Sequence, residues 1–178
     1  LYDNGSCIPL SDTLKGDIAE GTVVVTDFPG FNKQNAANRH CIREYGGRSF
    51  WVAFIDVDEF MVPDTSDDVK RVLENYEDFG GLCVNWKIFG SDGHLERPEG
   101  LQIGAFVRCM PNQHPWNQYV KTIARPSLIA KAQNAHYCEY VEGATCVNAR
   151  RDAVRGPYIP CDPNAPLRLN HYYTRSKQ

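Results

Sequence analysis

Three carboxylates stand within four residues at the end of an apolar run. The segment is WVAFIDVDEF, residues 51–60, and its acidic side chains belong to Asp56, Asp58 and Glu59. Carboxylates this close repel one another, and burying one without a partner costs several kcal/mol. A cation is the simplest compensation, because Asp-x-Asp offers the hard oxygen ligands that Mg²⁺ or Mn²⁺ prefers. Two carboxylates are too few to enclose such an ion, so the motif indicates a metal shared with substrate phosphates, although an ordinary solvated turn would carry the same residues.

The elements that position these carboxylates follow from the apolar pattern of the first half. The expected order is strand, helix, strand, helix, strand, at residues 21–28, 32–45, 49–55, 66–79 and 82–89. This order predicts an α/β fold with a mostly parallel central sheet flanked by helices, and Ser66 is the expected N-cap of the second helix. Ligands of such sheets bind beyond the carboxyl ends of the strands, where Asp56 and Asp58 stand.

The second half is β-rich. Strand-like pieces separated by Gly and Pro turns occur at residues 119–126, 128–141, 145–150 and 167–173. With 178 residues, 42% hydrophobic and 23% charged, the chain suits one domain, trimmed at both ends. The net charge of −3 and the lack of a basic block argue against nucleic-acid partners, and no run is long enough to cross a membrane. The seven cysteines include no Cys-x-x-Cys pair, so a structural zinc site is not expected.

Six short segments resemble glycosyltransferase family 92, in the family's order and over essentially the whole chain. They are YDNGS, Gln34 with HCI in residues 34–42, FWVAFIDVDEFMVP, NWKIFGSDGH, KTIARP and LNHYYTRS. The resemblance implies a GT-A type fold over residues 1–178, with a nucleotide-binding half (1–100) and a half that completes the acceptor and metal sites (101–178). It also implies metal-dependent transfer of a sugar from a nucleotide diphosphate sugar, a UDP-sugar first of all, to a glycan acceptor hydroxyl, with inversion.

The resemblance assigns the metal to Asp56, Asp58 and His171. Mn²⁺ or Mg²⁺ would sit against the donor diphosphate and neutralise charge on the leaving phosphate. Asp56 would act directly or through water and the ribose, and Glu59 would orient its neighbours or accept backbone donors. The alternative for His171 is a half-buried strand histidine bonded to a carbonyl.

Donor contacts are expected from both ends of the chain. Asp3, Asn4 and Ser6 would meet the base or ribose, although Asp-Asn-Gly is also a plain turn former. Lys121 would aim a positive charge at the diphosphate or donor sugar, as Arg125 would with less support from the pattern. Beyond His171, a guanidinium and a hydroxyl would hold phosphate oxygens, from Arg175 and Ser176. The alternative there is a frayed terminus.

An inverting transfer needs a general base for the acceptor hydroxyl. Asp92, in the turn FGSDGH, is the first choice, although the family more often has a small polar residue there, and His94, Glu139 and Glu142 compete for the role. Trp116, in a loop expected to be exposed, and Trp86 are candidates to stack on an acceptor sugar, with core packing as the alternative for Trp86.

Two rival functions remain open on the sequence. A phosphatase of the haloacid dehalogenase type would use Asp56 as its nucleophile, but Phe60 stands where that motif has Thr or Val. A non-catalytic sugar-binding domain would keep the fold without the activity. The chain would work in the Golgi lumen as part of a type II membrane protein, or in the cytoplasm as part of a soluble multidomain protein.

Overall fold

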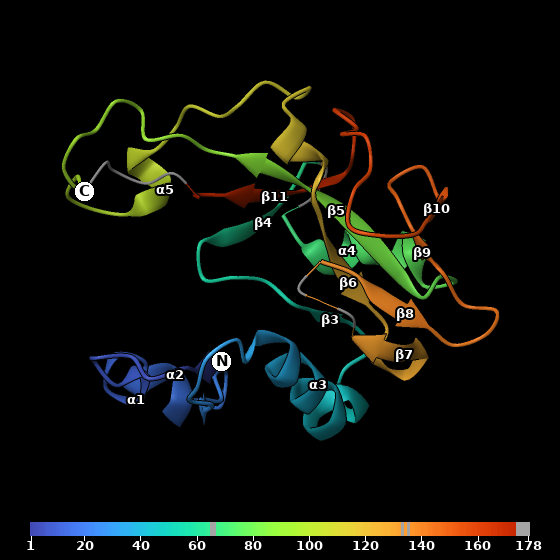
Figure 1. Ribbon diagram of the computed structural model, residues 1–178, viewed down its shortest axis with the longest axis horizontal. Coiled ribbons are helices and arrows are strands. Elements are labelled where there is room, and N and C mark those ends of the chain that lie inside the picture. Colours follow the sequence, from blue (N-terminus) through green and yellow to red (C-terminus); the bar gives the residue numbers. More distant parts are fainter. Residues whose placement is uncertain (65–66, 133, 135, 174–178) are drawn as a thin grey trace.

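The computed structural model describes residues 1–64, 67–132, 134 and 136–173, which form one large sheet with short helices around it (Figure 1). The long central strand β5 (Gly81–Ile88) pairs with β6 (Val120–Ala124) on one side. On its other side it pairs first with β9 (Cys146–Val147) and then with β11 (Leu167–His171). The outer strands are β3 (Val52–Ala53) beside β6, β4 (Glu59–Pro63) beside β11, and β10 (Ala153–Val154) beside β9.

The sheet is mixed, which corrects the expectation of a mostly parallel one. Of the six strand pairings described in this sheet, only those of β5 with β9 and with β11 are parallel, and the other four are antiparallel. Antiparallel neighbours need no crossover helix, and the described strands from β6 to β11 are connected by turns and loops rather than by α-helices. The order of elements is therefore α/β only in the first half of the chain.

The predicted elements of the first half are shorter than expected. Residues 21–28 contribute only β2 (Thr26–Asp27), which pairs with β1 (Tyr2–Asp3) in a separate two-stranded sheet and is not buried. Residues 49–55 contribute only the half-buried β3. β-propensity reports a fit to a half-buried pleated surface. β2 has only the two-residue β1 as its neighbour, and β3 pairs only with the last two residues of β6.

Helix α3 (Gln34–Tyr45) matches its prediction and runs into a 3₁₀ turn at Gly46–Arg48. The second predicted helix is α4 (Val69–Leu73), continued by a 3₁₀ turn at Glu74–Tyr76. Its N-cap is Asp68, whose side chain accepts a hydrogen bond from the Lys70 N–H, whereas Ser66 lies outside the described residues. Three short helices in the described part of the chain lie outside the predicted ones: α1 (Leu10–Thr13), α2 (Lys15–Ala19) and α5 (Gln102–Ala105).

The remaining elements are a hairpin and two 3₁₀ turns. The hairpin joins β7 (Ile129–Ala132) to β8 (Cys138–Tyr140), and the turns lie at Pro115–Gln118 and Pro126–Leu128. In Figure 1 the N-terminal segment with α1, α2 and α3 lies below β3, away from the main sheet. Among the described residues, no helix combines the length and the apolar character needed to cross a membrane.

One face of the sheet carries the main core. Its strand members come from β5, β6, β9 and β11, and they pack against one side of α4 and the following turn. The set is Val72, Leu73, Tyr76, Leu82, Val84, Ile123, Val147, Leu167 and Leu169. Side chains two residues apart on a strand share a face, so Trp86 and His171 continue these rows on the same face as Leu82 and Leu169. The core and the acidic segment therefore share one side of the sheet.

Candidate active site

Strand register brings the acidic segment and His171 together. Asp56, Val57 and Asp58 form the turn between β3 and β4, and Glu59 is the first residue of β4. The antiparallel pairing of β4 with β11 sets Glu59 opposite His171, and the parallel pairing of β11 with β5 sets His171 opposite Ile88. These side chains meet because three strands from distant parts of the chain end at one level.

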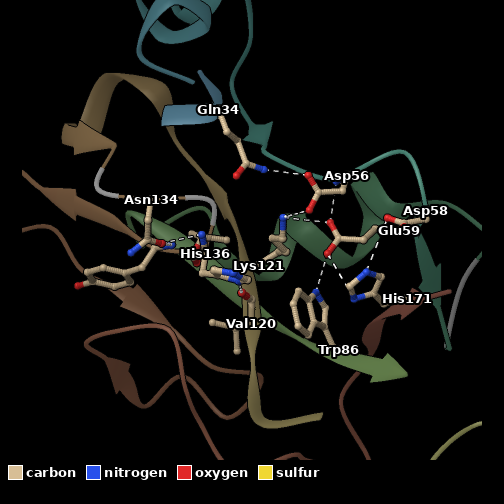
Figure 2. Close-up of polar contacts among 12 residues, drawn as sticks. Gln34, Asp56, Asp58, Glu59, Trp86, Val120, Lys121, Asn134, His136 and His171 are labelled. Atoms are coloured by element: carbon tan, nitrogen blue, oxygen red, sulfur yellow. Dashed lines mark hydrogen bonds and ion pairs between the residues drawn. The ribbon is translucent and has the colours of Figure 1, made fainter. Parts of the chain in front are cut away.

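Glu59 is the centre of the cluster. Its side chain is 0% exposed, one oxygen (Oε1) accepts a hydrogen bond from Trp86 Nε1 at 2.7 Å, and the other (Oε2) accepts one from the Asp56 N–H at 2.8 Å. Figure 2 shows it between Lys121, Trp86 and His171. Burial raises the pKa of Glu59, and the nearby Lys121 ammonium acts in the opposite direction. These contacts are those of a residue that orients its neighbours and accepts a backbone donor.

Lys121 supplies an internal positive charge. It lies on β6, its side chain is only 2% exposed, and its Nζ donates to Asp56 Oδ2 at 2.9 Å and lies 3.2 Å from Glu59 Oε2. Gln34, on α3, donates through Nε2 to the other Asp56 oxygen at 2.9 Å (Figure 2). The Lys121 ammonium and the Gln34 amide thus offset part of the repulsion among the carboxylates, whereas the sequence alone indicated only a bound cation.

Asp58 and His171 form the second part of the cluster. His171 Nε2 lies 3.7 Å from Asp58 Oδ1, and the ring packs at 4.4 Å from that of Trp86. Burial lowers the pKa of His171, which favours the neutral imidazole, the form that binds metals. Its other nitrogen, Nδ1, is buried without a hydrogen-bond partner among the described residues and lies 4.0 Å from Glu59 Oε1.

The residues fit a metal ion in part. An oxygen of Asp58 and Nε2 of His171 are close enough to share one ion, with the Glu59 carboxylate behind the ring in the position of an orienting group. Both oxygens of Asp56 are hydrogen-bonded, to Gln34 and to Lys121. The described residues gather no set of three or more His, Cys, Asp or Glu side chains able to hold a metal. Asp58 and His171 would bind the ion, and further ligands would come from phosphate oxygens or from Asp56 after it is released.

A cavity of about 510 Å³ opens beside Asp56. It lies between β1, α3 and β3, and its lining includes the polar residues Asn4, Gln34 and Asn38. Asn38 is 9% exposed, and its Nδ2 is buried with no hydrogen-bond partner among the described residues. An unpaired amide donor in a cavity wall is suited to a ligand with acceptor atoms. Sequence reasoning missed Asn38, although its position four residues after Gln34, on one face of α3, was a usable signal.

Comparison with known proteins defines the family. The family model for glycosyltransferase family 92 matches residues 10–153. The chain belongs to glycosyltransferase family 92. It is 28% identical over 158 residues, 84% of its length, to a glycosyltransferase family 92 protein of Ricinus communis. A family 92 protein of Oryza sativa subsp. japonica is also 28% identical, over 156 residues and 83% of this chain. The chain spans only 28% and 26% of the lengths of these two relatives.

In this family 92 chain, the predicted donor contacts near the N-terminus are divided between a turn and the cavity. Asp3 is buried, and its Oδ1 accepts hydrogen bonds from the N–H groups of Gly5 and Ser6 and from Ser6 Oγ, at 3.1, 2.9 and 2.8 Å. The hydrogen bonds from Ser6 lower the pKa of Asp3. Asp3 and Ser6 therefore make the turn chemistry that was the alternative reading, whereas Asn4 lines the cavity. Their role toward a donor stays a prediction.

The structure ties Asp92 to a neighbouring loop. Its carboxylate accepts hydrogen bonds from the N–H groups of Val107 and Arg108 at 2.7 and 3.0 Å, and the Arg108 guanidinium lies 3.3 Å away. Burial acts to raise the pKa of Asp92, but these hydrogen bonds outweigh it, and the pKa is lowered. A carboxylate held in this way is a weak base, so these contacts count against the general-base role, which stays a prediction.

The other predicted residues lie away from the Glu59 cluster or outside the described structure. Arg125 donates to the Glu77 carbonyl at 2.8 Å and lies over the Phe50 ring. Arg175 and Ser176 lie outside the described residues. Of the competing bases, His94 packs against Phe106, Glu139 lies on β8, and Glu142 lies in the turn after it.

The two tryptophans differ in surroundings. Trp86 is half-buried in the cluster through its bond to Glu59. Trp116 is 43% exposed, and its ring meets that of Tyr173 edge-on at 5.2 Å. Tyr173 in turn packs at 5.6 Å from His171, so an exposed aromatic surface leads from Trp116 to the candidate metal ligands.

Proposed function

We propose that this chain contributes the donor and metal sites of a glycosyltransferase that moves a sugar from a nucleotide diphosphate sugar to a glycan acceptor hydroxyl. The observation that carries the proposal is the pairing of Asp58 with His171 beside a cavity that Asp56 borders, in a family 92 chain. A GT-A type fold, a UDP-sugar donor, Mn²⁺ or Mg²⁺ and inversion at the anomeric carbon belong to the same proposal.

Each residue of the candidate site has a role in this proposal. The nucleoside would occupy the cavity, where Asn38 Nδ2 offers a hydrogen bond to an acceptor atom. Asp58 and His171 would hold the metal, which supplies Lewis-acid stabilisation of the leaving diphosphate when bound. Glu59 keeps Trp86 and the Asp56 backbone in place, and Lys121 holds the Asp56 carboxylate at the cavity edge.

The acceptor would approach over the exposed aromatic surface at Trp116 and Tyr173. A pyranose ring stacks on such side chains through its apolar face. The path from Trp116 through Tyr173 to His171 ends at the candidate metal ligands, next to which the leaving diphosphate would lie. No observation favours the phosphatase or the non-catalytic sugar-binding domain over this function.

Ligand-dependent thermal stability tests the proposal. The protein is heated with UDP or other nucleoside diphosphates, with and without Mn²⁺, and compared with Asp58→Asn, His171→Gln and the exposed control Asp12→Asn. We expect one nucleotide to raise the melting temperature only when Mn²⁺ is present, in the wild type and the control but not in the two site variants. Ligand at one hundred times its Kd adds about 2.7 kcal/mol of stability.

Three results would contradict the proposal. Unchanged Mn²⁺-dependent binding of the nucleotide in Asp58→Asn would show that Asp58 is not a metal ligand. Donor binding without hydrolysis or transfer of the sugar, measured as release of the nucleoside diphosphate, would indicate a binding domain. Trapping of an aspartyl-phosphate analogue with beryllium fluoride at Asp56 would indicate the phosphatase.

A further inference from the structure

Two buried cysteines on neighbouring strands bring their sulfur atoms together, at a distance from the candidate active site. Cys83 lies on β5 and Cys146 on β9, 63 positions further along the chain, and their Sγ atoms are 2.8 Å apart. Carbon atoms in ordinary contact are already about 3.5–4.0 Å apart, and sulfur is larger than carbon. A disulfide needs about 2.0 Å, so the two atoms have less than an ångström to close.

The local structure leaves room for this contact. Strand register sets Cys146 opposite Gly81, and Cys83 is two residues beyond Gly81, on the same face of β5. Because Gly81 has no side chain, no Cβ stands between Cys146 and Cys83 in this row. A Cβ added to Gly81 would meet the Tyr140 hydroxyl and lie 2.9 Å from the carbonyl oxygen of Ile123, so this part of the sheet is closely packed around the two thiols.

We propose that Cys83 and Cys146 form a disulfide that links β5 to β9. A low-molecular-weight disulfide, such as oxidised glutathione, is the oxidant. One thiol attacks it, releases one reduced thiol and forms a mixed disulfide. The second thiol then displaces the other reduced thiol, so that two protein thiols and one reagent disulfide give one protein disulfide and two reagent thiols.

The surroundings indicate the order and timing of these steps. Cys83 borders a cavity of about 290 Å³ beside β5, which a small reagent could enter, whereas Cys146 does not border it and is 0% exposed. Burial raises the pKa of Cys146, so its thiol stays protonated and is a slow nucleophile once the strands are packed. We therefore expect the bond to form most readily during folding, before β9 covers its own cysteine.

The bond would close a long loop and stabilise the sheet. Residues 84–145 lie between the two cysteines and include β6 with Lys121. Loop-closure entropy for a loop of this length corresponds to a rise in melting temperature of about 10 °C for a protein of this size. The proposal does not depend on the sugar-transfer function, because neither cysteine contacts the Glu59 cluster in the structure described above.

Peptide mapping of the wild-type protein tests the proposal directly. The reduced, unfolded chain is refolded in a buffer of oxidised and reduced glutathione, its free thiols are alkylated, and it is digested with trypsin and Glu-C without reductant. These enzymes separate the three neighbouring cysteines into residues 78–87, 132–139 and 143–150, which hold Cys83, Cys138 and Cys146. We expect 78–87 linked to 143–150. Alkylated thiols at both positions, or a link of either to Cys138 or Cys161, would overturn the proposal.

Melting temperatures give an independent readout. Reductant should lower the melting temperature of the refolded wild type, and of the control Cys7→Ser at an exposed position, by about 10 °C. The same treatment should leave Cys146→Ser unchanged. An equal response of Cys146→Ser and wild type would count against the bond, and if that variant does not fold, the peptide map of the wild type decides alone.

Discussion

Removing the charge of Lys121 should cost this protein much of its stability, and the loss should be traceable to Glu59 rather than to Asp56. Lys121→Met keeps the length of the buried side chain and deletes its ammonium group. Glu59 is then a buried carboxylate without its cation, and the hydrogen bonds that it keeps among the described residues come from Trp86 and the Asp56 N–H. Asp56 also loses a partner, but it keeps Gln34 and reaches solvent.

The exposed fractions of the two carboxylates set the expected magnitudes. The Glu59 side chain is 0% exposed, and breaking a buried pair costs about 3–5 kcal/mol. The Asp56 side chain is 43% exposed, where ion pairs contribute about 0–1 kcal/mol because water screens them. We expect Lys121→Met to lower the free energy of unfolding by about 3–4 kcal/mol, a large part of the roughly 5–15 kcal/mol of an ordinary domain.

Double-mutant cycles measure the two contributions. Lys121→Met is combined with Glu59→Gln in one cycle and with Asp56→Asn in the other, and unfolding in urea is followed by tryptophan fluorescence, with Trp86 as a reporter inside the cluster. We expect a coupling energy of about 2–3 kcal/mol between Lys121 and Glu59 and under about 1 kcal/mol between Lys121 and Asp56. Lys131→Met, at an exposed position of β7, is the matched control and should change little.

The reverse order of the two coupling energies would refute this reasoning. It would mean that the Lys121 ammonium is held mainly by the exposed carboxylate of Asp56 and that Glu59 is protonated in the folded protein. Protonation of Glu59 can be detected separately through the pH dependence of stability, because burial raises the pKa of Glu59. Stability would then fall as the pH rises through the pKa of Glu59 in the folded state, and Glu59→Gln would remove that dependence.

Three further predictions concern single positions. Burial lowers the pKa of His136 from 6.5, so as the pH falls this histidine takes up a proton in the unfolded chain before it does so in the folded protein. Stability should therefore fall as the pH drops below about 6.5, and His136→Gln should flatten this slope by up to about 1.4 kcal/mol per pH unit. Gly81→Ala places a Cβ 2.9 Å from the Ile123 carbonyl oxygen and should destabilise the sheet by about 1–3 kcal/mol in urea. If acceptors stack on Trp116, Trp116→Ala should raise the acceptor KM about tenfold, the equivalent of about 1.4 kcal/mol, without changing kcat.

Each of the three has a contrary result. An equal pH slope in His136→Gln and the wild type would show that other groups produce it. Gly47→Ala adds a Cβ with no heavy atom within 4 Å and should be nearly neutral, so similar losses in the two glycine variants would remove the packing argument. A loss of kcat in Trp116→Ala would place its effect on the reaction step rather than on acceptor binding.

Local pattern was sufficient for the elements that are long or strongly periodic. The helical spacing in residues 32–45 predicted α3, and the apolar run at 82–89 predicted β5 almost to its ends. It was insufficient for residues 21–28, a β-branched run that the fold leaves at the surface with a two-residue strand. Strand formation depends on a partner with a free edge, and the sequence of the segment itself does not contain that information.

The chemistry of the site divides in the same way. The sequence by itself indicated the carboxylates, the histidine and the lysine as candidate site residues, and its six segments indicated the family. Only the tertiary structure decided that Glu59 faces His171 across β4 and β11, and that Lys121 points from β6 toward the same carboxylates. Register carries this information, because a slip of one residue turns every side chain of a strand to the opposite face. The unpaired amide of Asn38 is likewise a property of the surrounding cavity, which forms only when β1, α3 and β3 come together.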